Sequence, residues 1–560
     1  MNRNSKSHFS ATDNRINIGR SRFDRNSWFK TTMATGKLIP FYVDEVLPGD
    51  TFEMKTSVLC RMATPLFPVM DNAYLDTYFF FVPNRLVWDH WKQFNGENDV
   101  NAWEQLIDYE IPQTPMLGGY RDDIIDGVTS SIEYSLFDYM GLPIHFSSGN
   151  SLDLVSALPL RAYQLVWNEW FRDQNLQDPI FIPKDDSYES ADSSHAREMA
   201  TVRRVCKFHD YFTSALPAPQ KGNAVLIPGF DGTTPVITRN VNRNVLGEPA
   251  LSLLPNLVTS PTSSGTPFVY SSGQVGLGSN PGTPGTQNTL TPSNLYVGTS
   301  SGVTIDALRT AFQIQKLLWR DGNGGTRYTE IIRSHFGVVS PDARLQRPEY
   351  LGGKRIPITV NQVIQQSASA DEPSPLGNTG AVSKTVDSFN GFTKSFTEHG
   401  ILLGVCCIRT DHTYQNGINR MWSRKDRFDF YYPELAHIGE QAILNKEIYY
   451  QEWDGANNPN DEVFGYQEAW AEYRYRPSYV TGAFRSQQSG GSLDSWHYAD
   501  DYRSLPYLSS EWIEEPSTNV ERTLAVQGNP NEQWLLDFYF DLKTTRPMPV
   551  YSVPGLVDHF

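Results

Sequence analysis

The stretch Thr51-Phe-Glu-Met-Lys-Thr-Ser-Val58 alternates apolar and polar side chains with a period of two. In a strand this period separates the two kinds of side chain onto opposite faces: Phe52, Met54 and Val58 on one, Glu53, Lys55 and Ser57 on the other. Residues 536–542 alternate in the same way, whereas residues 74–82 and 401–408 are almost entirely apolar or β-prone. We therefore predict two strands buried on one face and two strands covered on both faces.

Helical patterns lie between these strands. Apolar residues at helical spacing predict helices over residues 163–171 and 305–319, and residues 326–336 suggest a third. Strands separated by a hundred or more residues of helix and loop do not fit a doubly wound sheet, which needs regular strand–helix alternation. The pattern favours a mainly β fold, an antiparallel jelly roll whose connecting loops have grown into very long insertions.

One insertion stands out by its composition. In residues 231–300, 44 of 70 positions are Gly, Ser, Thr, Pro or Asn, so the segment lacks the apolar area for a core of its own. Two interpretations remain open. The segment is either a disordered linker or an exposed loop that becomes ordered when copies from neighbouring subunits pack together.

The charge of the chain is unevenly distributed. Its 560 residues contain 47 Lys and Arg against 63 Asp and Glu, a net charge of −16. The first 40 residues contain eight cations and two acids and so carry +6, which leaves −22 on the remainder. A basic arm on an acidic body suits a protein that touches a polyanion at one end.

The basic arm also carries aromatic residues between its cations. Cations neutralise phosphates and aromatic faces stack on unpaired bases, so the arm suits single-stranded nucleic acid without sequence preference. A solvated tail, or an arm that docks on a neighbouring subunit, is the alternative. A second basic cluster follows residue 200. The predicted nucleic-acid-binding residues are Arg15, Arg20, Arg22, Arg25, Trp28 and Lys30 of the arm, and Arg203, Arg204 and Lys207 of the second cluster.

The sequence carries one match to a catalytic motif, the nucleophile-elbow pattern Gly298-Thr-Ser-Ser-Gly302, which lies in the Gly/Ser-rich tract where chance matches are expected. There is no Walker A loop, no His-Glu-x-x-His and no Cys-x-x-Cys, and no apolar run approaches the roughly 18 residues of a membrane-spanning helix. Adjacent Cys406 and Cys407 point to opposite faces of a strand and are expected to pack as small apolar residues. The acidic pairs at 500–501 and 514–515 are expected to lie on the solvated surface. We predict no catalytic residue, metal or cofactor.

Several long strings resemble the major capsid proteins of gokushoviruses, a branch of the microviruses, which are small single-stranded DNA bacteriophages. The strings are LPLRAYQLVWNEWFRDQN (158–175), FHDYFTSALPAPQKG (208–222), GTRYTEIIRSHFG (325–337) and SPDARLQRPEYLGG (340–353), with SHFS (7–10) and RSRFD (20–24) at the start. The resemblance implies a structural protein with an eight-stranded antiparallel jelly roll of viral capsid type. It implies no catalytic residue.

The resemblance also implies an assembly. Copies of the subunit would tile a T=1 icosahedral shell of 60 copies, with pentameric and trimeric contacts, around circular single-stranded DNA. The chain would divide into an arm (1–35), a first part of the jelly roll (36–221), an insertion (222–303) and the remainder (304–560). The insertion would project at the threefold axes towards a host receptor. An internal scaffolding protein and a minor DNA-pilot protein would assist assembly in the host cytoplasm, and the product would be the virion.

A second class of function stays open on the residues alone. Acidity and abundant Trp are also found in carbohydrate-active enzymes and sugar-binding modules built on β-sandwiches. Such an enzyme requires two carboxylates roughly 5–10 Å apart beside a groove.

Overall fold

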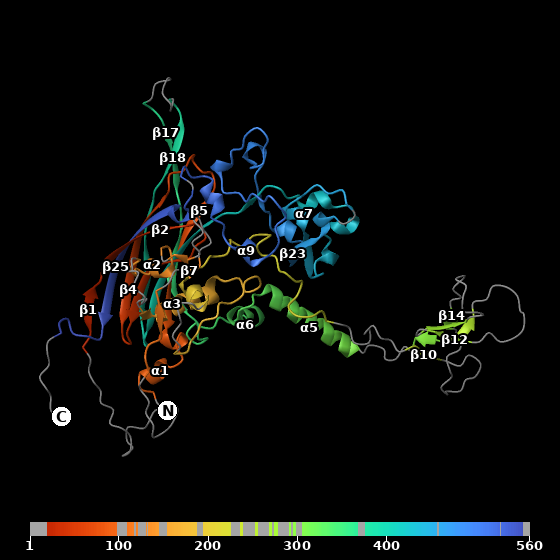
Figure 1. Cartoon of the computed structure of the whole chain (residues 1–560), viewed down its shortest axis with the longest axis horizontal. Coiled ribbons are helices and arrows are strands. Elements are labelled where there is room, and N and C mark those ends of the chain that lie inside the picture. The colour runs from red at the N-terminus through yellow and green to blue at the C-terminus, as the bar shows by residue number, and fades with distance from the viewer. Residues whose placement is uncertain are drawn as a thin grey trace, which may run out of the picture. The chain divides into compact units, whose positions relative to one another are not determined.

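The computed structural model describes residues 19–97, 109–116, 119–120, 130–131, 133–144, 154–186, 194–225, 305–367, 376–455, 458–526 and 528–552, together with the short strands β10 to β15. Its contacts divide the chain into two compact units (Figure 1). The larger unit contains Met1–Pro219 and Gly324–Phe560, and the smaller contains Gln220–Asn323.

The first sheet of the larger unit has five strands, each antiparallel to its partners. β25 pairs with β4 on one edge and with β1 and then β2 on the other, and β4 pairs with β19. The strands are β1 (Ser21–Asp24), β2 (Ser27–Met33), β4 (Thr51–Met62), β19 (Thr385–Ser395) and β25 (Trp534–Arg546). The predicted alternation of residues 51–58 and 536–542 is confirmed, because every second side chain of β4 and β25 is buried.

The second sheet has four antiparallel strands in the order β16-β5-β20-β3. They are β3 (Ile39–Val46), β5 (Ala73–Pro83), β16 (Glu349–Pro357) and β20 (Gly400–Thr410). The two central strands, β5 and β20, are buried almost without interruption, as predicted for strands covered on both faces.

The main hydrophobic core lies between the two sheets. The ring centroid of Phe41 on β3 lies 4.6 Å from that of Phe538 on β25. Phe79 on β5 lies 5.4 Å from Phe392 on β19. These rings are buried in one continuous cluster with apolar residues of both sheets, so the sheets pack face to face as a sandwich. The prediction of a mainly β, antiparallel fold is confirmed.

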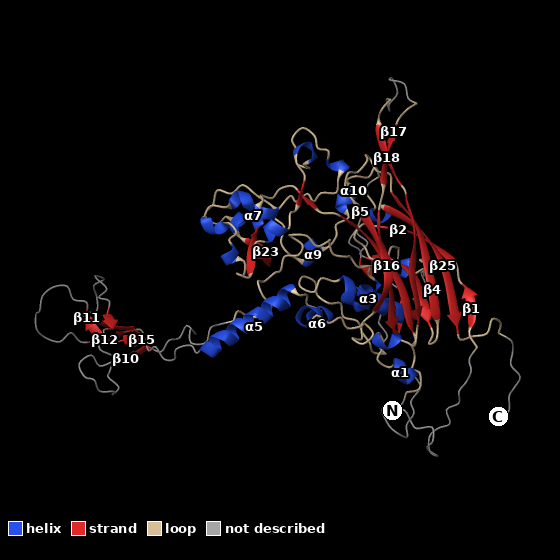
Figure 2. Ribbon diagram, turned by 180° about the vertical axis from the view of Figure 1, so that it is seen from behind, coloured by secondary structure: helices blue, strands red, loops and turns tan. Residues whose placement is uncertain are grey.

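The outer faces of the two sheets differ. On the four-stranded sheet, Tyr78 and Phe80 point away from the core and contact the rings of Phe171 and Trp170 at 5.2 and 5.3 Å. These two rings follow α3 (Leu158–Val166) in one π-helical turn, Trp167–Phe171. In Figure 2, α3 lies beside this sheet, whereas no described helix lies against the outer face of the sheet containing β25. Among the residues that the structure describes, only the second sheet is therefore covered on both sides, which explains its continuous apolar strands.

A second, smaller core lies in the same unit around α7 and β23 (Figure 1). The ring of Phe212 packs 4.7 Å from Tyr414, and Phe464 packs 5.2 Å from Trp512. β22 (Glu440–Leu444) and β23 (Val463–Glu468) form an antiparallel ribbon here. Five segments of the chain thus build this core, as expected if a long loop had become a subdomain.

The remaining elements of the larger unit are short. The helices are α1 (Trp91–Phe94), α2 (Leu136–Tyr139), α4 (Ser194–Ala200), α6 (Tyr328–Phe336), α7 (Asn445–Ile448), α8 (Ala471–Arg474), α9 (Ser510–Ile513) and α10 (Thr518–Glu521). The paired strands are β6 (Gln113–Pro115) with β9 (Leu154–Ser156), β7 (Gly119–Tyr120) with β8 (Ser130–Ser131), β17 (Val360–Ile364) with β18 (Thr379–Ser383), and β21 (Thr413–Tyr414) with β24 (Ser478–Tyr479).

The smaller unit contains nested β-ribbons and one helix, α5 (Ile305–Asn323). Three antiparallel pairs lie one inside another along the chain, so the backbone runs out and back as interrupted two-stranded ribbons. From the outermost pair inwards they are β10 (Val236–Thr238) with β15 (Leu295–Val297), β11 (Leu253–Pro255) with β14 (Leu290–Pro292), and β12 (Phe268–Ser271) with β13 (Gln274–Leu277).

Candidate nucleic-acid interface

The described part of the basic arm contains β1 and β2, which form one edge of the five-stranded sheet, opposite the edge strand β19. β1 and β2 pair with the same edge of β25, with Asp24 opposite Lys543 and Trp28 opposite Tyr539. Because side chains alternate along a strand, the even-numbered residues of β1 and β2 point to the open outer face. Arg15 lies outside the described residues.

The arm cations have different surroundings. Arg20 is exposed. The Nη2 atom of Arg22 lies 2.9 Å from Glu53 Oε2, and Lys30 Nζ lies 2.9 Å from Asp537 Oδ2. The side chains of Arg22 and Lys30 are 54% and 70% exposed, and ion pairs so open to water contribute about 0–1 kcal/mol. A phosphate could therefore compete for these cations at low cost.

Arg25 has a structural contact instead. Its guanidinium donates to both carboxylate oxygens of Asp44 on β3, at 2.6 and 3.0 Å. A two-point contact of this kind fixes the orientation of both groups. Arg25 thereby joins the turn between β1 and β2 to the edge strand of the other sheet.

Trp28 presents an aromatic ring on the open face. It is 69% exposed, and its ring centroid lies 5.0 Å from that of Tyr539 with a tilt of 41°. A large ring left open to water and flanked by cations is a common feature of surfaces that stack unpaired bases.

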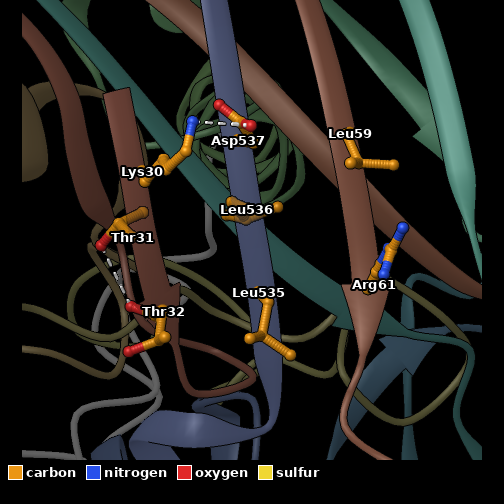
Figure 3. A pocket seen from close by; sticks show the side chains of 8 residues that line it. All are labelled: Lys30, Thr31, Thr32, Leu59, Arg61, Leu535, Leu536 and Asp537. Carbon is orange, nitrogen blue, oxygen red and sulfur yellow. Dashed lines mark hydrogen bonds and ion pairs between the residues drawn. The ribbon is translucent and has the colours of Figure 1, made fainter. Parts of the chain in front are cut away.

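A hollow of about 520 Å³ lies on the same face, and Figure 3 shows the residues that line it. Two of them, Lys30 and Asp537, are two residues from Trp28 and Tyr539 along β2 and β25. The cations Lys30 and Arg61 lie on either side, and Leu59 and Leu535 supply apolar surface between them. The complete lining is Lys30, Thr31, Thr32, Leu59, Arg61, Leu535, Leu536 and Asp537.

The sequence interpretation missed three cations of this face: Lys55 and Arg61 on β4 and Lys543 on β25. Within the described ranges, none of their side chains makes a hydrogen bond or an ion pair. With Arg22 and Lys30 they give five cations against four carboxylates, a local net charge of 5 − 4 = +1 on a chain of −16. The sequence could have identified Lys55, because the alternation of residues 51–58 already placed its side chain on the polar face of the strand. The opposed carboxylates are Asp24, Glu53, Asp537 and Asp541.

Arg203 and Arg204 lie elsewhere and bind within their own chain. Arg203 donates to Gln164 Oε1 at 2.9 Å and to the carbonyl oxygen of Glu198 at 2.7 Å, and its guanidinium covers the ring of Trp167. Arg204 lies 3.9 Å from a carboxylate oxygen of Glu514. Both side chains are less than a fifth exposed. The structure therefore does not bring these residues together with the arm as one basic surface.

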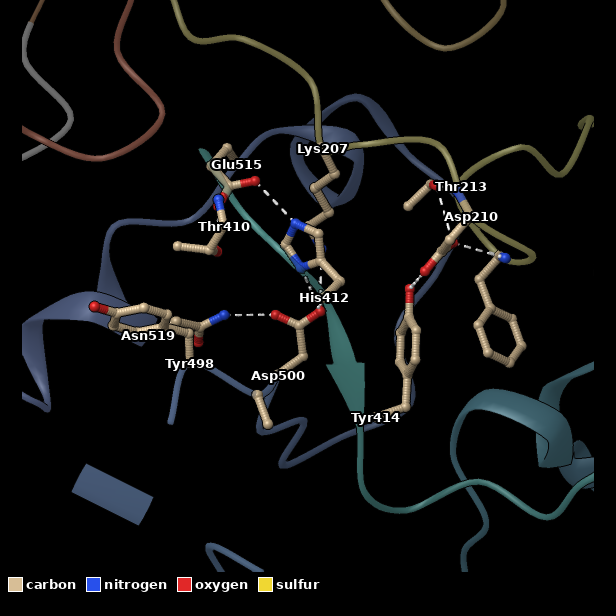
Figure 4. A network of polar contacts seen from close by, with 12 residues as sticks. Lys207, Asp210, Thr213, Thr410, His412, Tyr414, Tyr498, Asp500, Glu515 and Asn519 are labelled. Atoms are coloured by element: carbon tan, nitrogen blue, oxygen red, sulfur yellow. Dashed lines mark hydrogen bonds and ion pairs between the residues drawn. The ribbon is translucent and has the colours of Figure 1, made fainter. Parts of the chain in front are cut away.

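Lys207 belongs to a buried polar network between the two cores (Figure 4). Its Nζ atom lies 3.8 Å from Asp500 Oδ2 and 4.7 Å from the ring centroid of Trp512, and its side chain is 4% exposed. Burial of an unpaired ammonium would be costly, so Asp500 and the aromatic ring stabilise Lys207 in this position.

His412 is the centre of the same network. Its Nδ1 lies 3.0 Å from Asp500 Oδ2 and its Nε2 lies 2.8 Å from Glu515 Oε2, with both carboxylates buried. Burial alone lowers the pKa of His412, but the two negative charges outweigh it and raise the pKa to about 10. The expectation that residues 500–501 and 514–515 are solvated surface was thus wrong for Asp500 and Glu515, because their partners come from distant segments.

The described residues offer little other chemistry. All four cysteines are free and buried, including Cys406 and Cys407, as expected for thiols that pack as small apolar groups. Across the ranges that the structure describes, no three or more His, Cys, Asp or Glu side chains are arranged to hold a metal ion. No described helix is long and apolar enough to cross a membrane.

Comparisons with known proteins place these observations in a family. A family model described as capsid protein (F protein) matches residues 13–556. The chain is 40% identical to capsid protein VP1 of Chlamydia phage 1, over 96% of each chain. It is 40% identical to capsid protein VP1 of Bdellovibrio phage phiMH2K, over 97% of each. It is also 38% identical to capsid protein VP1 of Spiroplasma virus 4, over 93% of this chain and 92% of the relative.

Proposed function

The chain belongs to the capsid protein (F protein) family, and we propose that its copies close into a T=1 icosahedral shell of 60 subunits around circular single-stranded DNA. The resemblance to gokushovirus major capsid proteins is confirmed, and the role is structural rather than enzymatic. The protein is a component of the virion. The interpretation as a carbohydrate-active enzyme is therefore set aside, and sugar binding remains only as one form that host attachment could take.

We propose that the sandwich is an eight-stranded jelly roll. This proposal is supported by the order in which successive strands of the chain enter the two sheets. Counting β1 and β2 as one interrupted strand, the orders are β2-β25-β4-β19 and β16-β5-β20-β3. Successive strands cross from sheet to sheet, except between β5 and β16, which pair within one sheet. Such a wrapped arrangement is the topology of two interleaved Greek keys.

The observation that carries the functional proposal is the difference between the two outer faces. One sheet is covered by the chain's own helices and loops, and the other is open and carries the basic arm. A shell wall needs an inner side that meets the genome, so we assign the open face of the five-stranded sheet to the inside. Lys55, Arg61 and Lys543, whose side chains have no partner among the described residues, support this assignment, because counterion release favours their contact with phosphates.

Among the predicted DNA-binding residues, the exposed ones suit this role best. Arg20, Arg22, Trp28 and Lys30 lie on or beside the open face, and Arg15 precedes the described residues. Contact with DNA stays a prediction for Arg25, Arg203, Arg204 and Lys207, each of which would have to give up contacts within the chain.

Lateral contacts between copies are the second part of the proposal. The loops around the smaller core expose Trp422 and Phe428 at 75% and 74%, and further aromatic residues nearby are about half exposed. An apolar surface of this kind typically marks a protein–protein contact. The half-exposed aromatic residues are Phe430, Tyr431, Tyr450, Trp453, Tyr473 and Tyr475. We propose that neighbouring copies cover them through pentameric or trimeric contacts.

We propose that the insertion, residues 222–303, forms a protrusion at the threefold axes and binds a host receptor. Its nested ribbons support this proposal, because an isolated two-stranded ribbon is at best marginally stable in water. Three copies meeting at an axis would supply the missing contacts. Assembly in the host cytoplasm with an internal scaffolding protein and a minor DNA-pilot protein stays a prediction.

Assembly of the purified chain tests the proposal directly. The chain should be produced with the scaffolding protein of its phage, and the particles examined by electron microscopy and assayed for nuclease-protected DNA. We expect closed particles of 60 copies and single-stranded DNA. The double change Trp422→Ser and Phe428→Ser should abolish particles while the subunit keeps its far-ultraviolet circular dichroism. A wild-type chain that stays monomeric under every assembly condition would overturn the proposal.

A further inference from the structure

We propose that the Trp28–Tyr539 pair and the adjoining hollow form a base-stacking site for unpaired nucleotides of the enclosed genome. This inference rests on the proposed function, because it assigns the genome contact to a defined place on the open face. The occupant is single-stranded DNA, with a base against the rings and the neighbouring phosphates against the cations.

The row of side chains that contains Trp28 leaves room for a base. Register places Trp28, Tyr539, Ser57 and Ser388 side by side across four strands. The two serines beyond Tyr539 are hydrogen-bonded to each other at 2.9 Å, so they form a low, polar border. The Trp28 ring is 69% exposed, so a planar base can reach it from solvent.

The next two rows supply the hollow. Lys30, Asp537 and Leu59 lie in the first row, and Thr32, Leu535 and Arg61 lie in the second. Rows on one face of a strand are two residues apart, about 7 Å. By this register the hollow of about 520 Å³ begins one row from the aromatic pair, and its size lies within the ordinary range of ligand sites.

The combination of cations and exposed aromatic rings favours a strand of nucleotides as the occupant. Arg61 has no partner within the described residues, and Lys30 has only an exposed ion pair with Asp537. A second copy of the chain, with a net charge of −16, could also offer carboxylates to these cations, so the stacking rings distinguish the two occupants. A single strand brings one phosphate for each base and matches both the cations and the rings.

The inference predicts a specific loss of binding. Fluorescence anisotropy with the unassembled full-length subunit and a labelled oligothymidylate of roughly 20 nucleotides should give wild-type binding, and Trp28→Ala should weaken it roughly 5- to 100-fold. Trp28→Phe should keep affinity within about threefold, since it retains a stacking ring. Arg61→Ala should make the slope of log affinity against log salt concentration shallower by the contribution of about one phosphate contact. Tyr507→Ala, which removes an aromatic ring that is 70% exposed and lies outside the five-stranded sheet, is the control and should bind as the wild type does.

The outcomes separate this inference from the proposed function. Particles that contain DNA, but whose ultraviolet cross-links to nucleotides avoid the peptides of Trp28 and Tyr539, would overturn the inference alone. Unchanged oligothymidylate binding by Trp28→Ala would also overturn the inference alone. If Trp28→Ala binds oligothymidylate as the wild type does but fails to assemble, a protein and not DNA covers this face. Particles that never contain DNA would overturn the proposed function. A DNA duplex of equal length should bind Trp28→Ala and the wild type with the same affinity. If Trp28→Ala loses affinity equally for the duplex and for oligothymidylate, base stacking is excluded.

Discussion

Replacing His412 with Ala tests whether the buried network between the two cores stabilises the subunit. In the folded chain the imidazole lies between the carboxylates of Asp500 and Glu515, and its side chain is 2% exposed. The variant leaves two buried carboxylates without the cation that lies between them. Glu515 keeps its bonds from Thr410, and Asp500 keeps Asn519 and Lys207, so the network is weakened rather than abolished.

The expected magnitude follows from the pKa of His412. A rise from 6.5 to about 10 corresponds to about 5 kcal/mol of stabilisation, as an upper figure. Removing one partner of a buried ion pair costs about 3–5 kcal/mol. We therefore expect His412→Ala to lower the free energy of unfolding by about 3–5 kcal/mol near pH 6.

The pH dependence gives a second signature. Because the folded pKa of His412 is above the unfolded value, its contribution is fully present below pH 6.5 and is lost as pH rises towards about 10. The stability difference between wild type and variant should therefore be largest near pH 6 and should narrow steadily up to pH 10.

Urea unfolding of unassembled subunits, followed by Trp fluorescence between pH 6 and 10, measures both effects. His209→Ala is the matched control, because His209 is exposed and its loss should change stability by less than about 0.5 kcal/mol. The reasoning is refuted if His412→Ala matches the wild type near pH 6, or if the difference between them stays constant up to pH 10.

Two further predictions concern the sandwich. Gly353→Ala should destabilise the subunit by about 1–3 kcal/mol, because the added Cβ would overlap the carbonyl oxygen of Thr77 in the paired strand. Gly380→Ala, whose Cβ would have only one neighbour at 3.9 Å, is the control, and equal melting temperatures for the two variants would contradict the packing argument. Burial raises the pKa of the Cys60 and Cys407 thiols to about 12, so iodoacetamide at pH 8 should modify the four cysteines of the native subunit far more slowly than those of the urea-unfolded chain. Labelling of a native thiol at the unfolded rate, read by mass spectrometry, would show that its site is open.

The strand faces of this protein could be predicted from the sequence, because they depend on a local period. Alternation along residues 51–58 and 536–542 separated a buried face from an open one, and continuous apolar runs at 74–82 and 401–408 indicated cover on both sides. The π-helical turn after α3 covers the outer face of the four-stranded sheet. Its aromatic rings belong to the apolar stripe that the sequence showed over residues 163–171. The family resemblance supplied the expected function from long strings of residues.

Sheet order and charge pairing could not be predicted in this way. The alternation placed Lys55 on the polar face of β4, but it could not show that Lys543 shares that face, because the two strands are nearly five hundred residues apart in sequence. The same limit applies to Lys207, which resembled a DNA-binding cation beside Arg203 and is instead buried against Asp500.

What the sequence alone determined was which side of each strand is apolar and which family the chain resembles. What only the tertiary structure decided was the partner of each charge. Asp500 and Glu515 carry the sequence signature of a solvated surface, yet the fold places them around His412 and away from water. Hydrophobic periodicity is written in neighbouring residues, whereas the environment of a charge depends on which distant segments the folded chain packs against it.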